Sequence, residues 1–77
     1  MRTRHDAAVR QFRLWDAKAK KDLPHRYYSV WRNAHLGALV EARWGKVGTT
    51  VEVYDCTTGK LHGQYTRTPT SVAFQGA

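Results

Sequence analysis

Few residues of this 77-residue chain have the types and spacings that catalysis needs. Acid–base chemistry needs two carboxylates in one cleft, and nucleophilic chemistry needs a nucleophile beside an orienting base. Glu41 and Glu52 are the acidic residues that neighbouring strands would bring together. Like charges directly opposite each other destabilise a sheet unless a metal or a shared proton separates them. We therefore attribute this pair to strand register and expect no enzymatic activity.

The histidines and the cysteine give no metal-binding signature. His5, His25, His35 and His62 show no pairing at two or four residues, the spacings that place two ligands on one metal. Cys56 is the only cysteine, which excludes an intramolecular disulfide and a cysteine-based zinc site. No basic residue lies within two positions of Cys56 to lower the pKa of its thiol. We expect no catalytic residue, no metal and no cofactor.

Basic and aromatic residues are interleaved over residues 25–46, and this pattern suits nucleic acid. They are His25, Arg26, Tyr27, Tyr28, Trp31, Arg32, Arg43, Trp44 and Lys46. Phosphates attract Lys and Arg, whereas bases stack on flat rings and guanidinium planes. The net charge is +7, and residues 49–77 carry two basic and two acidic side chains, so the surplus lies before them. The chain is predicted to attract polyanions, more weakly as salt is added.

The element expected to carry much of this charge is an N-terminal amphipathic helix over residues 6–23. Apolar residues fall on one stripe at helical spacing, and Arg10, Arg13, Lys20 and Lys21 fall on the opposite face. Pro24 lacks a backbone N–H and restricts the residue before it, so it should end the helix. The alternative for these cations is an ordinary solvated helix face.

From His25 onward the apolar period changes from 3.6 to 2, which predicts strands. One parity carries the apolar residues from Tyr28 to Trp44, with Arg32 as the exception. A run of this length exceeds one ordinary strand, so we expect strands near 26–32 and 38–44 with a connection between them. A second helix over residues 26–36 is the competing interpretation.

The later chain predicts a hairpin, with strands near 51–54 and 61–66. Asp55 opens the turn, and Gly59 stands four residues later where positive φ is needed. Residues 72–74 add a short edge strand. The predicted fold class is α+β, a single domain over residues 1–77 in which the N-terminal helix packs on a four- to five-stranded antiparallel meander over about 26–75.

Residues 26–49 resemble the WGR domain, a nucleic-acid-binding module of poly(ADP-ribose) polymerases and small bacterial proteins. The resemblance is carried by the aromatic-rich strand at Arg26-Tyr27-Tyr28, by Leu36-Gly37, and by Trp44-Gly45-Lys46-Val47-Gly48 in place of W-G-R-[IV]-G. It implies DNA contacts by Trp44 and Lys46. Lys46 departs from the motif because it lacks the planar fork of Arg. The family also has a helix after the motif, whereas here a helix is expected before it.

We therefore predict a non-catalytic nucleic-acid-binding domain, and the WGR resemblance favours DNA over RNA. The predicted contact residues are Arg10, Arg13, Lys20, Lys21, Arg26, Tyr27, Trp31, Arg43, Trp44 and Lys46. Because Trp44 falls on the apolar parity and Lys46 does not, Lys46 is the better candidate for an external contact.

The alternative function is a small protein-binding module, such as a phage- or mobile-element-encoded inhibitor that docks on an acidic host protein. An edge strand near 70–75 would then pair with a partner sheet. A homodimer that buries Tyr27 and Trp31 is compatible with either function. No apolar run approaches the length of a membrane span or a signal-peptide core, so we expect a soluble, cytoplasmic protein without membrane contact.

Overall fold

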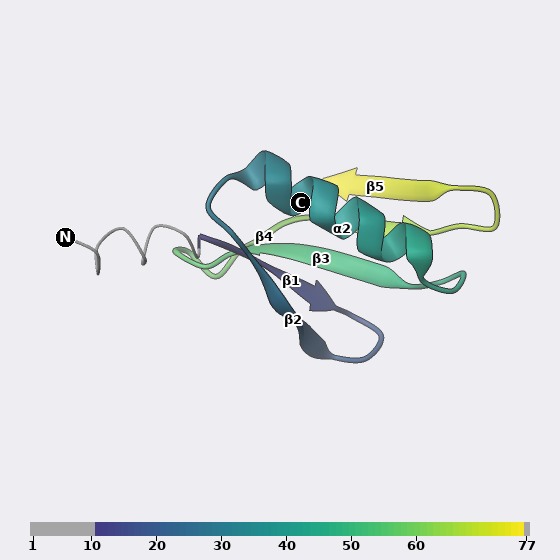
Figure 1. The fold of residues 1–77 in the computed structure, drawn as a ribbon, viewed down its shortest axis with the longest axis horizontal. Helices are drawn as coiled ribbons and strands as arrows, with labels where there is room; N and C mark the ends of the chain where they lie inside the picture. The colour runs from purple at the N-terminus through teal and green to yellow at the C-terminus, as the bar shows by residue number, and fades with distance from the viewer. Residues whose placement is uncertain (1–10, 77) are drawn as a thin grey trace.

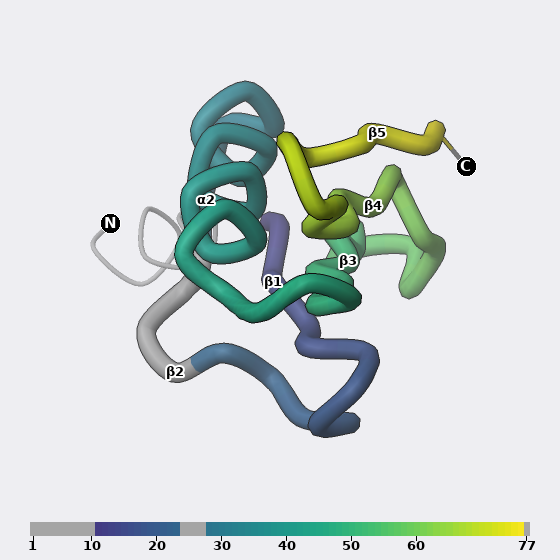
Figure 2. The backbone as a smooth tube through the Cα atoms, turned by 90° about the vertical axis from the view of Figure 1, so that its right-hand side faces the viewer, coloured from purple at the N-terminus to yellow at the C-terminus, as the bar shows by residue number. Residues whose placement is uncertain are grey.

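The structure, a computed structural model, describes residues 11–76, and for residues 24–27 it describes the backbone alone. The elements in chain order are β1 (Phe12–Asp16), β2 (Lys21–Tyr28), α2 (Trp31–Trp44), β3 (Thr50–Asp55), β4 (Leu61–Arg67) and β5 (Val72–Gly76). The strands form one antiparallel sheet in the order β2-β1-β3-β4-β5. Helix α2 covers one face of this sheet (Figure 1), and the strands follow an arc beside it (Figure 2).

The core lies between α2 and the central strands. Its fully buried apolar residues are Leu14, Ala34, Ala38, Ala42, Val51 and Val53. The three alanines recur every four residues on one side of α2, and their small side chains let the helix backbone approach the sheet closely. Leu14, Val51 and Val53 fill the space beneath them, and burying each stabilises the fold by roughly 1.5–3 kcal/mol. Residues between them in the strands, such as Trp15 and Glu52, point to the other face of the sheet.

The predicted strand over residues 38–44 is wrong, because residues 31–44 form α2. The period of two arose from two interleaved helical stripes. Ala34, Ala38 and Ala42 are buried, whereas Leu36, Val40 and Trp44 are exposed. Each stripe repeats every four residues, and an offset of two residues turns about 200° around a helix, so the stripes lie on opposite sides. The competing prediction of a second helix was right in kind, but that helix begins at Trp31 and ends at Trp44.

The predicted N-terminal helix packed on a meander is also wrong. Residues 12–16 and 21–28 form the strands β1 and β2, and the single described helix follows them. Leu14 is buried against α2, whereas Arg13 and Trp15 lie on the opposite sheet face. Pro24 lies in β2, which is an edge strand and so tolerates a residue without an N–H. The first part of the predicted helix, residues 6–10, lies outside the described residues.

Two turns of the same design connect β1 to β2 and β3 to β4. The Asp16 carboxylate accepts hydrogen bonds from the N–H groups of Lys18 and Ala19, both at 3.0 Å. The Asp55 carboxylate likewise accepts from Thr57 and Thr58 N–H groups. The residue four positions after each Asp has positive φ. The predicted hairpin at Asp55 is therefore confirmed, and the chain contains the same hairpin at Asp16.

The position that closes these turns differs between them. Lys20 has φ 57° and Gly59 has φ 74°, and each N–H donates to the carbonyl of its Asp at 2.7 Å. A left-handed conformation costs a residue with a Cβ about 1–2 kcal/mol, and glycine avoids this cost. Lys20 thus holds strain that Gly59 does not.

Lys20→Gly should raise the free energy of unfolding by about 0.5–1 kcal/mol, because relief of the left-handed strain exceeds the greater freedom of glycine in the unfolded chain. The reciprocal Gly59→Lys should lower it by about 1 kcal/mol or more. Urea unfolding followed by tryptophan fluorescence measures both. If Lys20→Gly were destabilising, the strain assigned to the first turn would be absent.

Candidate nucleic-acid interface

Three turns meet at one end of the sheet, the end that faces the viewer in Figure 2. They are residues 17–20, 45–49 and 68–71. Ala17 N–H donates to the Thr50 carbonyl at 3.0 Å, which joins the first turn to the start of β3. Gly48 N–H donates to the Arg67 carbonyl at 2.8 Å, and Arg67 N–H donates to the Thr49 carbonyl at 2.8 Å. The antiparallel register therefore fixes the three turns beside one another.

This end of the molecule gathers positive charge from segments that are far apart in the chain. We call its cations the basic end, which consists of Lys18, Lys20, Lys21, Arg43, Lys46 and Arg67. All except Arg67 are exposed, and none of the six forms an ion pair with another described residue. Residues 17–20, 45–49 and 68–71 contain no acidic residue, and the carboxylates nearest in sequence to the first turn are Asp16 and Asp22. Unneutralised charge from three segments produces a local positive potential that attracts anions.

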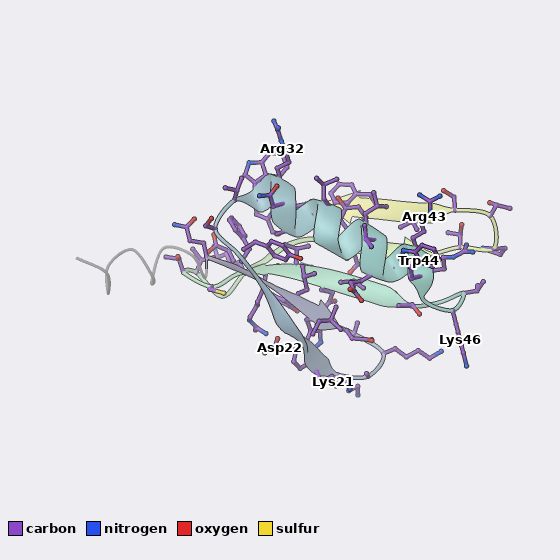
Figure 3. The ribbon with its side chains drawn as sticks, in the orientation of Figure 1. Lys21, Asp22, Arg32, Arg43, Trp44 and Lys46 are labelled. Carbon is purple, nitrogen blue, oxygen red and sulfur yellow. The ribbon has the colours of Figure 1, made fainter. Side chains whose placement is uncertain are left out.

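An exposed tryptophan borders the basic end. Trp44, the last residue of α2, is 82% exposed and lies beside Arg43. Figure 3 shows Arg43, Trp44 and Lys46 at one end of the helix and Arg32 at the other. Gly45 ends the helix in extended conformation, and Gly48 has φ 97°, so the backbone turns sharply before β3. The Trp44 ring is thus available for stacking within reach of cations.

The other predicted contact residues are dispersed. Arg13 lies on the sheet face away from α2, where it forms an ion pair with Asp22 and packs over the Trp15 and Tyr54 rings at 5.8 and 5.0 Å. Trp31 begins α2, at the opposite end from Trp44. Of the ten predicted residues, Lys20, Lys21, Arg43, Trp44 and Lys46 lie in or next to the three turns, with Lys20 and Lys21 at the β1–β2 hairpin and Arg43 and Trp44 at the end of α2. Arg10 and the side chains of Arg26 and Tyr27 lie outside the described parts.

Two cations of the basic end were not predicted as contacts. Lys18 lies within the predicted helix over residues 6–23, and Arg67 lies in residues 49–77, where basic and acidic side chains are equal in number. The signal for Lys18 was Asp16, which opens its turn as Asp55 opens the other. Arg67 gave no sequence signal, because only the sheet register places the end of β4 beside the turn at residues 45–49.

A second cluster of functional groups lies under the start of α2. His35 is 8% exposed, and its Nδ1 is 2.9 Å from the Tyr65 hydroxyl. Its Nε2 is 2.8 Å from Nδ1 of His62, whose ring also packs near Trp31. Burial, followed by the neighbouring His62, lowers the pKa of His35 from its ordinary value of 6.5. Burial likewise raises the pKa of Tyr65. His35 is therefore neutral at pH 7 and acts as a polar bridge between α2 and β4.

The remaining reactive groups are not assembled into a site within the described part of the chain. Glu41 lies on α2, whereas Glu52 lies on the far sheet face and accepts a hydrogen bond from the Tyr54 hydroxyl at 2.9 Å. Partial burial raises the pKa of Cys56, which keeps its thiol protonated at neutral pH. No group of three or more potential metal ligands occurs among the described residues.

Comparison with protein-family models, curated proteins and solved structures finds no match to this chain. The resemblance of residues 26–49 to the WGR domain therefore stays a prediction. The described helix is too short and too polar to cross a membrane.

The buried histidine predicts a pH-dependent stability. Because the pKa of His35 is lower in the folded than in the unfolded protein, the unfolded state binds more protons below about pH 6.5. The free energy of unfolding should have its highest value above that pH and should fall as the pH drops through it. Urea unfolding at pH 7.5 and 5.5 measures the effect, and His35→Gln should reduce it. An equal fall in the His35→Gln variant would place the cause elsewhere.

Proposed function

We propose that this protein binds nucleic acid, without catalysing a reaction on it, through the basic end and Trp44. The observation that carries the proposal is the convergence of cations from three separate segments, which are residues 18–21, residues 43–46 and Arg67 at the end of β4. Scattered surface lysines are common and imply little, but a patch built from three segments forms a concentrated field. The WGR resemblance favours DNA over RNA.

The arrangement suits a phosphate backbone. Duplex DNA carries one charge for about every 1.7 Å of axis, so several cations on one surface can contact phosphates together. Lysines contact phosphate as point charges and read no sequence, so they set affinity and position. This predicts binding with little base specificity.

Trp44 adds a contact that cations alone do not supply. An indole that is 82% exposed beside Arg43 offers a flat surface to an unpaired base, and such stacking contributes roughly 1–3 kcal/mol per base. Bases within a duplex are already stacked on each other. The basic end should therefore prefer single strands, or duplex ends with unpaired bases, to blunt duplex.

Lys46→Ala should weaken oligonucleotide binding and reduce the slope of log affinity against log salt by about one. Lys60→Ala is the matched control, because Lys60 is also exposed but follows the Asp55 turn at the other end of β3. Fluorescence anisotropy with a labelled single strand, a blunt duplex and an RNA at two or more salt concentrations measures the affinities. Binding that ignores salt, or equal losses in the two variants, would contradict a role for the basic end.

A second candidate function rests on the outer stripe of α2, which consists of Leu36, Val40 and Trp44. These residues lie on the side of the helix away from the sheet and are 53%, 48% and 82% exposed. Apolar residues aligned on an exposed helix face are typical of a docking surface. The stripe has Arg32 near one end and Arg43 near the other, so charge complementarity favours an acidic protein partner.

Self-association of two copies through the outer stripe is less favourable than binding of an acidic partner. Antiparallel pairing of the helices about Val40 would place Arg32 of one copy near Lys46 of the other. Like charges brought together across an interface oppose association. An acidic amphipathic segment from another protein would instead meet apolar residues along the stripe and cations at its ends.

Val40→Glu separates the two candidate functions. It places a negative charge in the outer stripe, so binding to an acidic protein partner should fall at least tenfold, whereas oligonucleotide affinity should change by less than about threefold, since Val40 lies outside the basic end. A pull-down from nuclease-treated lysate tests protein binding, and anisotropy tests nucleic acid. If nuclease removes every recovered partner, the protein-binding function is rejected.

A further inference from the structure

A groove of about 390 Å³ lies between α2 and the turn that joins β4 to β5. It is lined by Leu39, Arg43, Arg67, Thr70, Ser71 and Val72. Two arginines and two hydroxyl residues share this space, and no acidic residue lines it. Its volume is within the range of small-molecule sites, which is about 300–1,000 Å³. The lining therefore combines anion-binding groups with room for a small ligand.

Arg67 is held in place at the base of this groove. Its guanidinium donates to the Thr68 carbonyl and, at 3.2 Å, to the Ser71 carbonyl. The turn is itself closed by hydrogen bonds from Thr68 N–H to the Ser71 carbonyl at 2.8 Å and from Ser71 N–H to the Thr68 hydroxyl at 2.9 Å. A guanidinium fixed by the backbone loses little conformational freedom when a ligand binds.

Donors remain available in the groove. Arg67 Nε is buried and has no hydrogen-bond partner among the described residues. Because it has almost no accessible surface, Nε does not count among the donors that a ligand in the groove could meet. The Thr70 and Ser71 hydroxyls form no hydrogen bond within the described part of the chain, and Arg43 is exposed at the rim. The groove thus combines two positive charges with several N–H and O–H donors.

The number and arrangement of these donors favour phosphate over carboxylate. One arginine satisfies both oxygens of a carboxylate, whereas a phosphate monoester has three terminal oxygens and two negative charges. The C-terminal end of α2 opposes an anion with about half an elementary charge, which the two guanidinium groups outweigh. Leu39 and Val72 give the groove apolar walls, and these suit the organic part of a ligand.

We propose that this groove is a binding site for the phosphate of a small phosphomonoester of about mononucleotide size. Arg43 and Arg67 bind the phosphate oxygens, Thr70 and Ser71 donate to them, and the sugar or base lies against Leu39 and Val72. This site takes a free small molecule and does not depend on nucleic-acid binding at the basic end.

NMR titration of ¹⁵N-labelled protein tests the site, with inorganic phosphate, adenosine monophosphate and adenosine as probes at constant ionic strength. Resonances of Ser71 N–H and Arg67 Nε–H should shift and saturate with phosphate and with the nucleotide. The nucleotide should bind at least about tenfold more tightly than phosphate, and adenosine should not bind measurably. Shifts that do not saturate, or equal binding of adenosine and the nucleotide, would overturn the proposal.

Variants distinguish specific phosphate binding in the groove from general electrostatic attraction of an anion to the positive charge. Arg43→Gln should weaken nucleotide binding at least tenfold, and so should the double substitution Thr70→Val and Ser71→Ala, which retains both positive charges. Lys46→Ala removes one charge at the same end but outside the groove, and it should weaken nucleotide binding less than about twofold. Equal effects of Arg43→Gln and Lys46→Ala would reject the site.

Oligonucleotide affinity of the same proteins separates this proposal from the proposed function. The double hydroxyl variant should lose nucleotide binding and retain its oligonucleotide affinity, because Thr70 and Ser71 do not belong to the basic end. Saturable nucleotide binding without oligonucleotide binding would reject the proposed function and leave the groove. Oligonucleotide binding without saturable nucleotide binding would reject the groove alone.

Discussion

The close packing of the alanine stripe of α2 on the central strands is the contact on which the rest of the structure depends. The side chains of Ala34, Ala38 and Ala42 are single methyl groups, so the helix backbone can lie close to Leu14, Val51 and Val53 of the sheet. Helix α2 consequently contacts all five strands, and the sheet follows an arc beside it. A core this small gives a low free energy of unfolding. Polar contacts such as the hydrogen bond between His35 and Tyr65 therefore matter more to stability.

That packing also determines which side chains the protein presents to partners. With one side of α2 packed on the sheet, Leu36, Val40 and Trp44 face solvent, and the end of the helix lies beside the turn at residues 68–71. The basic end and the phosphate groove follow from this placement. Each combines side chains that are remote in the chain, as Arg43 and Arg67 are, and neither would exist if the helix lay at another angle.

The two proposed sites use positive charge in different ways. At the basic end the lysines are exposed and form no ion pair with another described residue, which suits contact with a repeating phosphate backbone at many positions. In the groove, Arg67 is held by two backbone carbonyls, which suits one phosphate in one place. Arg43 and Arg67 belong to both regions, so a phosphate in the groove would remove two cations from the basic end.

Properties that depend on neighbouring residues, or on a sum over the whole chain, can be predicted from the sequence. The surplus of positive charge is additive, and the hairpin at Asp55 follows from an Asp and a Gly at fixed spacing. The similar hairpin at Asp16 was not predicted, because Lys20 occupies the left-handed position where glycine usually indicates such a turn. Whether residues 38–44 form a strand or a helix depends on tertiary packing, because alternating apolar residues suit a strand and a two-sided helix equally. Tertiary packing also determines which cations lie near one another. The sheet register places Arg67 beside the turn that carries Lys46, although the two residues are remote in the chain.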